Sequence, residues 1–310
     1  MGAGFNSVGA PCLGIAQRCD RVVMIAGVRY NGRMEQTIGF TSDGLALKGF
    51  LHVPDGAGKH PGLVLCHGFG GSCRGAGHPE LAKALEQAGY AVLRFDFRGC
   101  GQSEGKRGDV IVDAEIADLR HAIDFLQTQP SVDAARIGVI GASLGGSVAI
   151  EVAASDVRVR VCVANGSVGN GERRYRAQYK DEAAWRAFLK RLDEAKRAKT
   201  TLNRFEIVYI PESDRAGLPP GAIMDFTAAT AQSMLDSCPE RVVARIAPRP
   251  LLLVHPRGDR VVPYQESEAL AKAAGKNAEL HIIEGSAHFG SGSAEIAALV
   301  LDFLKRHLAA

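Results

Sequence analysis

The residues with the clearest chemical potential lie in the stretch Gly141-Ala142-Ser143-Leu144-Gly145. An apolar, β-forming run at residues 137–140 precedes this stretch, and small, helix-compatible residues follow it. That order is typical of a nucleophile elbow, a strand-to-helix turn so tight that the residues two before and two after the serine must lack side chains. Gly141 and Gly145 meet this requirement, so the pattern predicts that Ser143 is a nucleophile.

A serine hydroxyl is a weak nucleophile at neutral pH and needs a base, which itself needs an orienting group. Residues 250–255 are apolar and predict a buried strand, and Asp259 follows them. The next predicted strand, residues 278–284, is followed by His288. Loops at the carboxyl ends of parallel strands are where open α/β sheets place their chemistry. The chain order Ser143, Asp259, His288 therefore predicts a catalytic triad.

Both downstream residues also have an ordinary structural interpretation. Asp259 stands in a Gly-Asp-Arg turn, where a carboxylate commonly bonds nearby backbone N–H groups, and His288 could be a polar loop residue. Asp225 and Asp236 fall in a predicted insertion and are poorer candidates for the acid. The other histidines lie on predicted strands, helices or turns, and none follows the last core strand: His52, His60, His67, His78, His121, His255, His281 and His307.

Two backbone N–H groups are predicted to form an oxyanion hole. The first is that of Leu144, the residue after the nucleophile, at the start of the following helix. The second is that of Phe69, in the glycine-rich loop after the predicted strand at residues 61–66. Gly68 and Gly70 flank Phe69 and would let a substrate approach the backbone. An ordinary glycine-rich turn is the alternative interpretation of this loop.

With these residues, the chain resembles the α/β-hydrolases of the esterase and S9/S33-peptidase-like branch. It is most similar to bacterial carboxylesterases of the cinnamoyl or feruloyl esterase kind, which share the His-Gly-Phe stretch at residues 67–69 and the Phe-Asp-Phe-x-Gly-x-Gly-x-Ser stretch at 95–103. The resemblance covers about residues 35–309. It implies an α/β-hydrolase fold, in which a mostly parallel, doubly wound sheet carries an inserted, mainly helical cap. It also implies cleavage of carboxylic esters through an acyl-enzyme on Ser143.

Strand and helix patterns alternate along the chain and divide it into three parts. Residues 1–33 are expected to be a loosely ordered extension or a packing arm, and Met34 is an alternative start of translation. Residues 34–168 and 246–310 should form the α/β core, with strands at 63–66, 91–95, 137–140 and 159–164 and helices at 79–88 and 113–126. The second of these helices has Asp113 as its expected N-cap.

Residues 169–245 interrupt the alternation and should form the cap, since a plain crossover needs only about a dozen residues. The segment between Asn165 and Arg249 is longer and more basic than the resemblance leads us to expect. Residues 181–199 predict an amphipathic helix, 211–221 a hinge or lid edge, and 227–235 a short helix. Trp185, Phe205 and Tyr209 are the candidate substrate contacts, although they could equally form the core of the cap. The basic residues are expected to form a solvated face rather than a carboxylate site: Arg173, Arg174, Arg176, Lys190, Arg191, Lys196, Arg197 and Lys199.

Composition narrows the remaining function classes. The chain has 310 residues, of which 46% are hydrophobic and 23% charged, with a formal net charge of +3. This balance gives no footprint for nucleic acid, and no run approaches the length of a membrane span. The seven cysteines are scattered, which favours a reduced, cytoplasmic protein. No metal or organic cofactor is implied, the expected partner is a small-molecule ester, and a homodimer is left open.

The same machinery supports other reactions. A peptidase or acylaminoacyl-type amide hydrolase, a thioesterase and an acyltransferase would all use the triad. A C–C bond hydrolase is compatible with the cap, and a non-catalytic ligand receptor would normally show a broken triad, whereas here all its parts are present.

Overall fold

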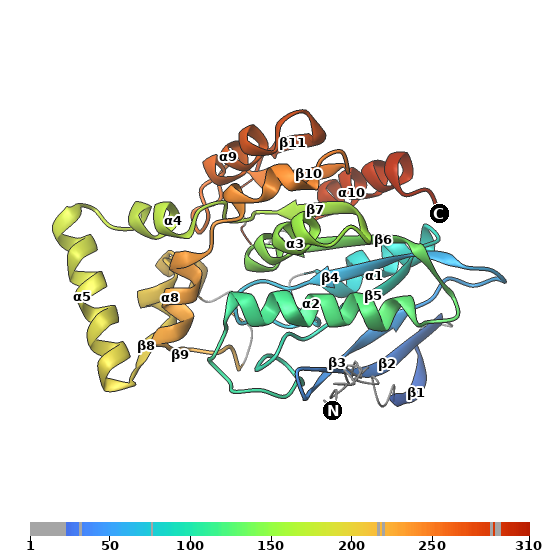
Figure 1. Cartoon of the computed structure of the whole chain (residues 1–310), viewed down its shortest axis with the longest axis horizontal. Helices are drawn as coiled ribbons and strands as arrows, with labels where there is room; N and C mark the ends of the chain where they lie inside the picture. Colours follow the sequence, from blue (N-terminus) through green and yellow to red (C-terminus); the bar gives the residue numbers. More distant parts are fainter. Residues whose placement is uncertain are drawn as a thin grey trace, which may run out of the picture.

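A nine-stranded sheet organises the chain in the computed structural model (Figure 1), which describes residues 23–30, 33–75, 77–215, 218, 221–285, 288 and 293–310. The strands of this sheet are β1 (Val23–Tyr30), β2 (Arg33–Ser42), β3 (Leu45–His52), β4 (His60–Cys66), β5 (Ala91–Phe95), β6 (Val132–Ala142), β7 (Val159–Asn165), β10 (Leu251–Pro256) and β11 (Ala278–Ile283). The helices outside the cap are α1 (His78–Gln87), α2 (Val112–Gln127), α3 (Leu144–Ser155), α9 (Gln265–Ala274), α10 (Ala294–His307) and the 3₁₀ turn η3 (Gly275–Asn277).

The strand order is β1-β2-β3-β5-β4-β6-β7-β10-β11. β1, β2 and β3 are antiparallel to their neighbours in this sheet. The other six strands, β5, β4, β6, β7, β10 and β11 in spatial order, run parallel to one another. The carboxyl ends of β4, β6, β10 and β11 therefore lie at one edge of the sheet. This is the mostly parallel α/β-hydrolase architecture that the sequence predicts, and the prediction is confirmed.

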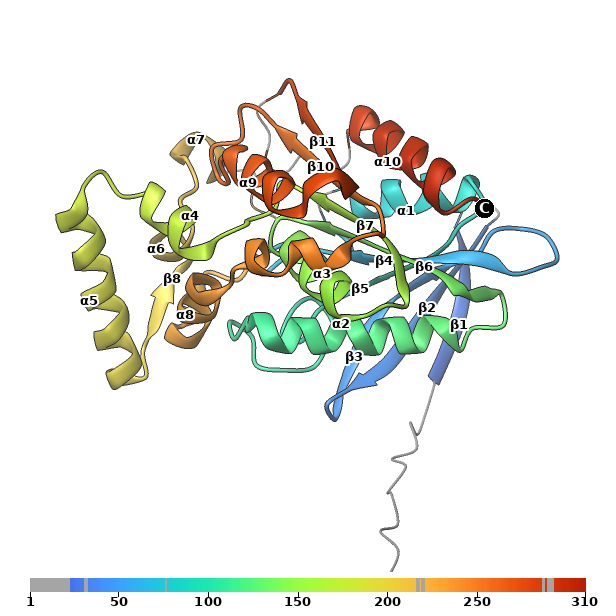
Figure 2. The same cartoon turned by 45° about the horizontal axis from the view of Figure 1, so that its top comes forward.

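Both faces of the sheet are covered by helices (Figures 1 and 2). Side chains alternate along a strand, so Val64 and Cys66 of β4 pack with α2, α3 and α9, whereas Leu63 and Leu65 pack with α1 and α10. Burial on both faces explains why these strands are continuous apolar runs rather than alternating ones. Each fully buried Leu or Val contributes roughly 1.5–3 kcal/mol to folding.

Residues 23–30 correct one expectation. They form β1, which pairs with β2 as an antiparallel edge strand, with Val28 opposite Glu35 and Tyr30 opposite Arg33. A loosely ordered extension is therefore wrong for this segment, and the alternative of a packing arm fits it. Residues 1–22 lie outside the described part of the chain.

The cap, defined here as residues 171–246, connects β7 to the neighbouring strand β10 and gathers beyond one end of the sheet (Figure 2). It contains α4 (Gly171–Ala177), α5 (Glu182–Ala198), β8 (Thr201–Asn203), α6 (Arg204–Ile207), α7 (Glu212–Arg215), β9 (Asp225–Thr227), α8 (Ala228–Asp236), η1 (Pro239–Arg241) and η2 (Val243–Ile246). The predicted amphipathic helix is confirmed as α5, whose N-cap Asp181 accepts a hydrogen bond from Ala184 N–H. Its Phe188 stacks on both Trp185 and Tyr179, and Trp185 contacts Tyr179 at a tilt.

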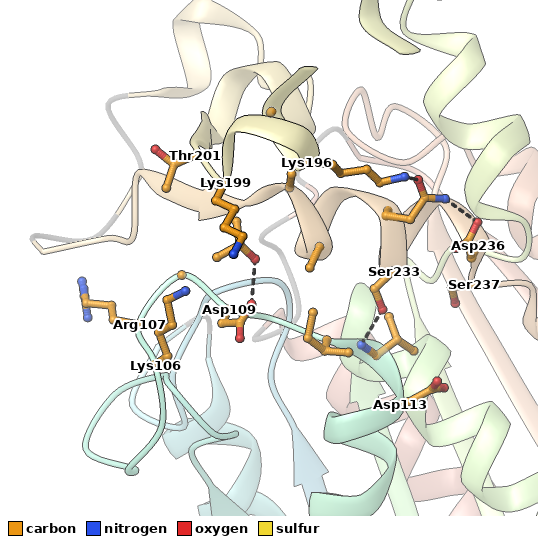
Figure 3. A pocket seen from close by; sticks show the side chains of 18 of the residues that line it. Lys106, Arg107, Asp109, Asp113, Lys196, Lys199, Thr201, Ser233, Asp236 and Ser237 are labelled. Carbon is orange, nitrogen blue, oxygen red and sulfur yellow. Dashed lines mark hydrogen bonds between the residues drawn. The ribbon is translucent and has the colours of Figure 1, made fainter. Parts of the chain in front are cut away.

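Helix α8 caps the core helix α2. The hydroxyl of Ser233 accepts a hydrogen bond from Val112 N–H at 2.9 Å (Figure 3), and that of Thr230 accepts one from Val110 N–H at 2.9 Å. Asp113, expected as the N-cap, is instead the second residue of the helix, because α2 begins one residue earlier at Val112. There its carboxylate faces the positive end of the helix dipole without capping it.

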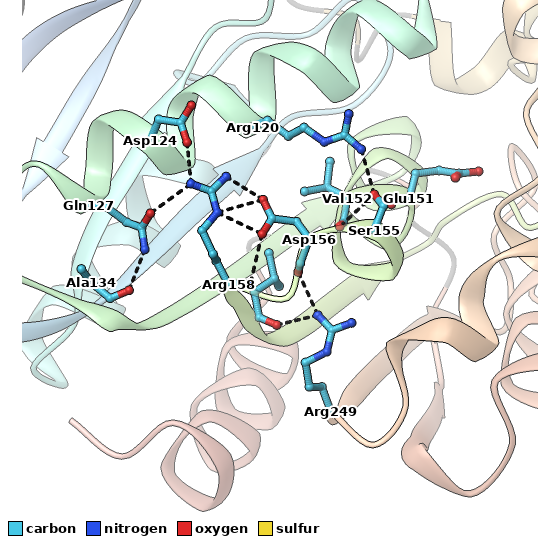
Figure 4. A network of polar contacts seen from close by, with 11 residues as sticks. Arg120, Asp124, Gln127, Ala134, Glu151, Val152, Ser155, Asp156, Arg158 and Arg249 are labelled. Atoms are coloured by element: carbon cyan, nitrogen blue, oxygen red, sulfur yellow. Dashed lines mark hydrogen bonds and ion pairs between the residues drawn. The ribbon is translucent and has the colours of Figure 1, made fainter. Parts of the chain in front are cut away.

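A polar network ties the elements together at the amino end of β7, opposite the cap (Figure 4). Arg158 forms ion pairs with Asp156 at 2.7 Å and with Asp124 of α2 at 2.5 Å. Arg249, which enters β10, donates to the carbonyl oxygens of Asp156 and Val159. No helix in the described part of the chain is long and apolar enough to cross a membrane.

Candidate active site

Ser143 lies on a strained turn between β6 and α3. Its φ of 54° and ψ of −123° are values that side-chain-bearing residues rarely adopt, and such strain gathers at functional sites. A Cβ on Gly141 would overlap the carbonyl oxygen of Gly145, and a Cβ on Gly145 would overlap that of His67. The amide of Ser143 donates to Asn165 O at 2.8 Å, which fastens the turn to β7. The elbow predicted from the glycine spacing has this geometry.

The three side chains predicted as a triad meet at the carboxyl edge of the sheet. Ser143 follows β6, Asp259 follows β10, and His288 follows β11. His288 Nε2 lies 2.9 Å from Ser143 Oγ, and His288 Nδ1 lies 2.6 Å from Asp259 Oδ2. An ionised Asp259 only accepts hydrogen bonds, so it places the ring proton on Nδ1 and leaves Nε2 to accept from the serine hydroxyl.

The surroundings of Asp259 hold it in the ionised form. Burial by itself would raise the pKa of this carboxyl, but hydrogen bonds from His255, His288 and the Val262 amide outweigh burial and leave the pKa well below its usual value. Its Oδ1 accepts from the amides of Val261 and Val262 at 2.8 and 2.9 Å. Asp259 is thus more than a turn residue, since Oδ2 remains directed at His288.

His255 supports Asp259 from within the core. Its Nε2 lies 3.4 Å from Asp259 Oδ2 and 2.9 Å from Val262 O, and its Nδ1 lies 2.7 Å from Ser267 Oγ. Both neighbours of Nε2 are acceptors, so Nε2 carries the proton and Nδ1 accepts from the serine hydroxyl. A neutral imidazole satisfies every one of these contacts. The sequence placed His255 at a strand end but gave no sign of this supporting contact.

The predicted oxyanion donors lie beside Ser143. Leu144 and Phe69 both line the cavity above the serine, and neither amide donates to another group within the described part of the chain. Phe97 N–H donates to His67 Nε2 at 3.1 Å, so His67 Nδ1 is protonated and donates to Gly68 O at 2.9 Å. His67 therefore shapes the loop. A Cβ on Gly68 would sit 3.1 Å from Ser143 Cβ.

A cavity of about 570 Å³ opens above Ser143 and His288. Its apolar wall comes largely from the cap, through Val208, Ile210, Ile223 and Met234. Trp185, Phe205 and Tyr209, the candidate substrate contacts, do not line it. Trp185 is buried in the aromatic cluster on α5, Phe205 packs under Arg215, and Tyr209 is exposed, so their choice as substrate contacts is corrected.

Two arginines line the cavity that were not predicted to do so from the sequence. Arg174 was assigned to a solvated face, but it is only 3% exposed and lines the cavity. Arg204, in α6, is 5% exposed and lines it too. The Asn203-x-x-Glu206 spacing forms a capping box at the start of α6, and this signal could have marked a helix at Arg204.

A second cavity, of about 970 Å³, lies between the cap and the start of α2 (Figure 3). Side chains of both signs line it, including Lys106, Asp113, Lys199 and Asp236. It contains no member of the triad, and its balanced charges indicate no ligand class.

The chain belongs to the family of serine aminopeptidases, S33, whose family model matches residues 59–289. This family has the α/β-hydrolase fold. A 31.7 kDa protein from the traX-finO intergenic region of Escherichia coli is 30% identical over 86% of this chain and 97% of its own length. The polyketide transferase grgF of a Penicillium species is 28% identical over 87% of this chain and 95% of its own length.

Solved structures agree on the fold. The crystal structure of the α/β hydrolase GrgF from Penicillium sp. sh18 has a TM-score of 0.74 and 24% identity, and it covers 89% of this chain and 99% of its own. Est1E from Butyrivibrio proteoclasticus, solved with ferulic acid bound, has a TM-score of 0.66 and 23% identity, with 88% and 99% covered.

Proposed function

We propose that this protein is a serine hydrolase that cleaves carboxylic esters. The observation that carries the proposal is the continuous hydrogen-bond chain from Ser143 Oγ through His288 to Asp259. Membership of an α/β-hydrolase family supports it independently.

In the proposed reaction, His288 takes the hydroxyl proton as Ser143 Oγ attacks the ester carbonyl. The amides of Leu144 and Phe69 stabilise the oxyanion, aided by the positive end of the α3 dipole. His288 then protonates the leaving alcohol and later activates the water that releases the acid from the acyl-enzyme. Ionised Asp259 stabilises the imidazolium in both steps.

The direct test is hydrolysis of p-nitrophenyl butyrate by the wild type and by Ser143→Ala. We expect kcat to fall by about 10³–10⁶-fold, because the triad acts as a unit. A fluorophosphonate should label Ser143 in the wild type, as located by peptide mass spectrometry.

Ser147→Ala is the matched control. Ser147 lines the same cavity, but its hydroxyl donates to Val168 O rather than to a histidine. This variant should keep most of the activity. Near-wild-type turnover by Ser143→Ala, or labelling at another residue, would refute the proposal.

A second candidate is acyl transfer from a thioester or ester to an alcohol. The full-length similarity to a protein named a polyketide transferase favours it. The same acyl-enzyme would form, and the acceptor alcohol would replace water. Incubation with an acyl-CoA and graded concentrations of an alcohol, with products counted by mass spectrometry, separates the two. New ester growing with alcohol concentration would indicate transfer, and free acid at every concentration would indicate hydrolysis.

A further inference from the structure

Apart from the triad, the formally charged side chains that line the cavity above Ser143 are all arginines among the described residues. Four arginines line the cavity, namely Arg74, Arg107, Arg174 and Arg204, and no Asp or Glu is among its described lining residues. Arg74 and Arg107 are exposed at the rim, whereas Arg174 and Arg204 are buried. A buried guanidinium without a carboxylate is costly, because desolvation is not offset by an opposite charge.

Arg204 lies against the oxyanion loop. Its Nη2 is 3.4 Å from the carbonyl oxygens of both Phe69 and Gly70, and its Nε donates to Ile223 O at 2.7 Å. The guanidinium also lies over the rings of Phe69 and Phe226. Its Nη1 donates to no described residue, although Arg204 borders the cavity. Burial lowers the pKa of Arg204 to about 10, so the side chain stays charged at neutral pH.

Arg174, in α4, reaches the loop that carries Asp259. Its Nη2 donates to Val261 O at 3.0 Å, two residues beyond Asp259, and its Nη1 donates to Gln178 Oε1 and Ile207 O. Every acceptor around it is uncharged. Burial lowers the pKa of Arg174, and the nearby carboxylates of Asp259 and Glu266 offset this effect only in part.

Other arginines of this chain do have carboxylate partners. Arg94, which is equally buried, pairs with Glu35 at 2.6 Å. Arg173, next to Arg174 on α4, pairs with Glu240 and Glu266 at 2.8 and 2.7 Å. Among the buried arginines of the described residues, Arg94 has a carboxylate partner, whereas Arg174 and Arg204, which line the cavity, have none within salt-bridge distance.

We propose that the substrate carries a carboxylate in addition to its scissile ester, and that Arg174 and Arg204 bind it. This inference rests on the proposed esterase function and names its substrate class. The cap supplies both arginines, so it would select the substrate by charge while its apolar wall accommodates the carbon skeleton. A guanidinium that also holds Phe69 would couple binding of the anion to the position of the oxyanion donor.

The test compares two esters with one skeleton, mono-p-nitrophenyl adipate and its neutral methyl ester. The six-carbon chain keeps the free carboxylate from readily attacking its own ester carbonyl. We expect the wild type to favour the anionic ester by at least about tenfold in kcat/KM. Arg174→Gln and Arg204→Gln should each lower this ratio several-fold, and the ratio discounts any general loss of activity from a disturbed loop.

Arg176→Gln is the matched control, because Arg176 lies on the same helix but is exposed and pairs with Glu182. It should keep the wild-type ratio. Equal or better turnover of the neutral ester would overturn the inference while leaving the esterase standing. A preference that persists in both glutamine variants would overturn the assignment to these arginines.

A binding measurement separates this inference from the proposed chemistry. Ser143→Ala, titrated calorimetrically with monomethyl adipate, should bind it at least about tenfold more tightly than dimethyl adipate. The added change Arg204→Gln should abolish the difference, and circular dichroism should confirm that each variant is folded. If no ester is hydrolysed, selective binding of the anion would still support the site, whereas equal binding of the two adipates would overturn it.

Discussion

At the residue scale, the orientation of one carboxylate determines what the histidine can do. Asp259 Oδ1 is held by two backbone amides, which leaves Oδ2 alone to face His288. The ring proton then sits on Nδ1, and Nε2 can accept the proton of Ser143. The strained φ of Ser143 brings its hydroxyl within reach of that nitrogen.

Asp259→Asn tests this arrangement. The amide oxygen should keep the Oδ1 position and its two N–H donors, so the NH₂ group would face His288 Nδ1. That contact favours the tautomer with the proton on Nε2, which cannot accept from Ser143. We expect kcat for p-nitrophenyl butyrate to fall by about 10⁴-fold with little change in melting temperature. Activity within tenfold of the wild type would show that the carboxylate does not set the tautomer.

Residue-scale features were predictable where local pattern and chain order determine them. The glycines around Ser143 and the loop positions of Asp259 and His288 follow from strand patterns and spacing. Arg174 was misplaced because α4 has only seven residues, too few to show which face is buried. In its buried position Arg174 donates to Val261 O, which lies 87 residues later in the sequence, so no local pattern could indicate this contact.

At the element scale, the cap and the core complete each other. The first amides around the start of α2 have no side-chain partner from their own segment, since the N-cap residue is Ile111. Thr230 and Ser233 of α8 supply the acceptors. Both helices were predicted from the sequence near their observed bounds. Their hydrogen-bonded partners, Val110 with Thr230 and Val112 with Ser233, are 120 and 121 residues apart in the sequence and could not be found from local signals.

Thr230→Val should therefore destabilise the protein. Valine has nearly the same shape but leaves the buried Val110 N–H without its acceptor, while Gly108 O loses the hydroxyl donor and keeps the amide of Thr227. We expect the free energy of unfolding in urea to fall by about 1–3 kcal/mol. Thr200→Val, at an exposed position next to β8, should change it by less than about 0.5 kcal/mol. Equal effects of the two changes would contradict a capping role for α8.

At the scale of the whole molecule, the candidate active site lies away from the sheet edge that the amino-terminal strands form. Ser143 follows β6 and the other two triad residues follow β10 and β11, whereas β1 and β2 lie at the opposite edge. The alternating pattern predicted that the core strands run mostly parallel, since parallel strands must be joined by crossovers, but it did not predict their spatial order. It did not identify β1, because a single apolar run does not reveal whether it pairs with a neighbour or remains loose.

A chain that begins at Met34 measures what β1 contributes. Removing residues 1–33 takes away an edge strand but none of the described residues that line the cavity or form the triad, so kcat/KM for p-nitrophenyl butyrate should stay within about twofold of the full chain. The loss uncovers the hydrogen-bonding edge of β2, and an open edge is a template for pairing with another chain. We therefore expect a lower melting temperature and a larger share of oligomers in size-exclusion chromatography. If the truncated protein stays monomeric with an unchanged melting temperature, β1 adds nothing to the stability of the sheet. If it folds but loses much of its kcat/KM, the amino-terminal edge of the sheet affects the active site.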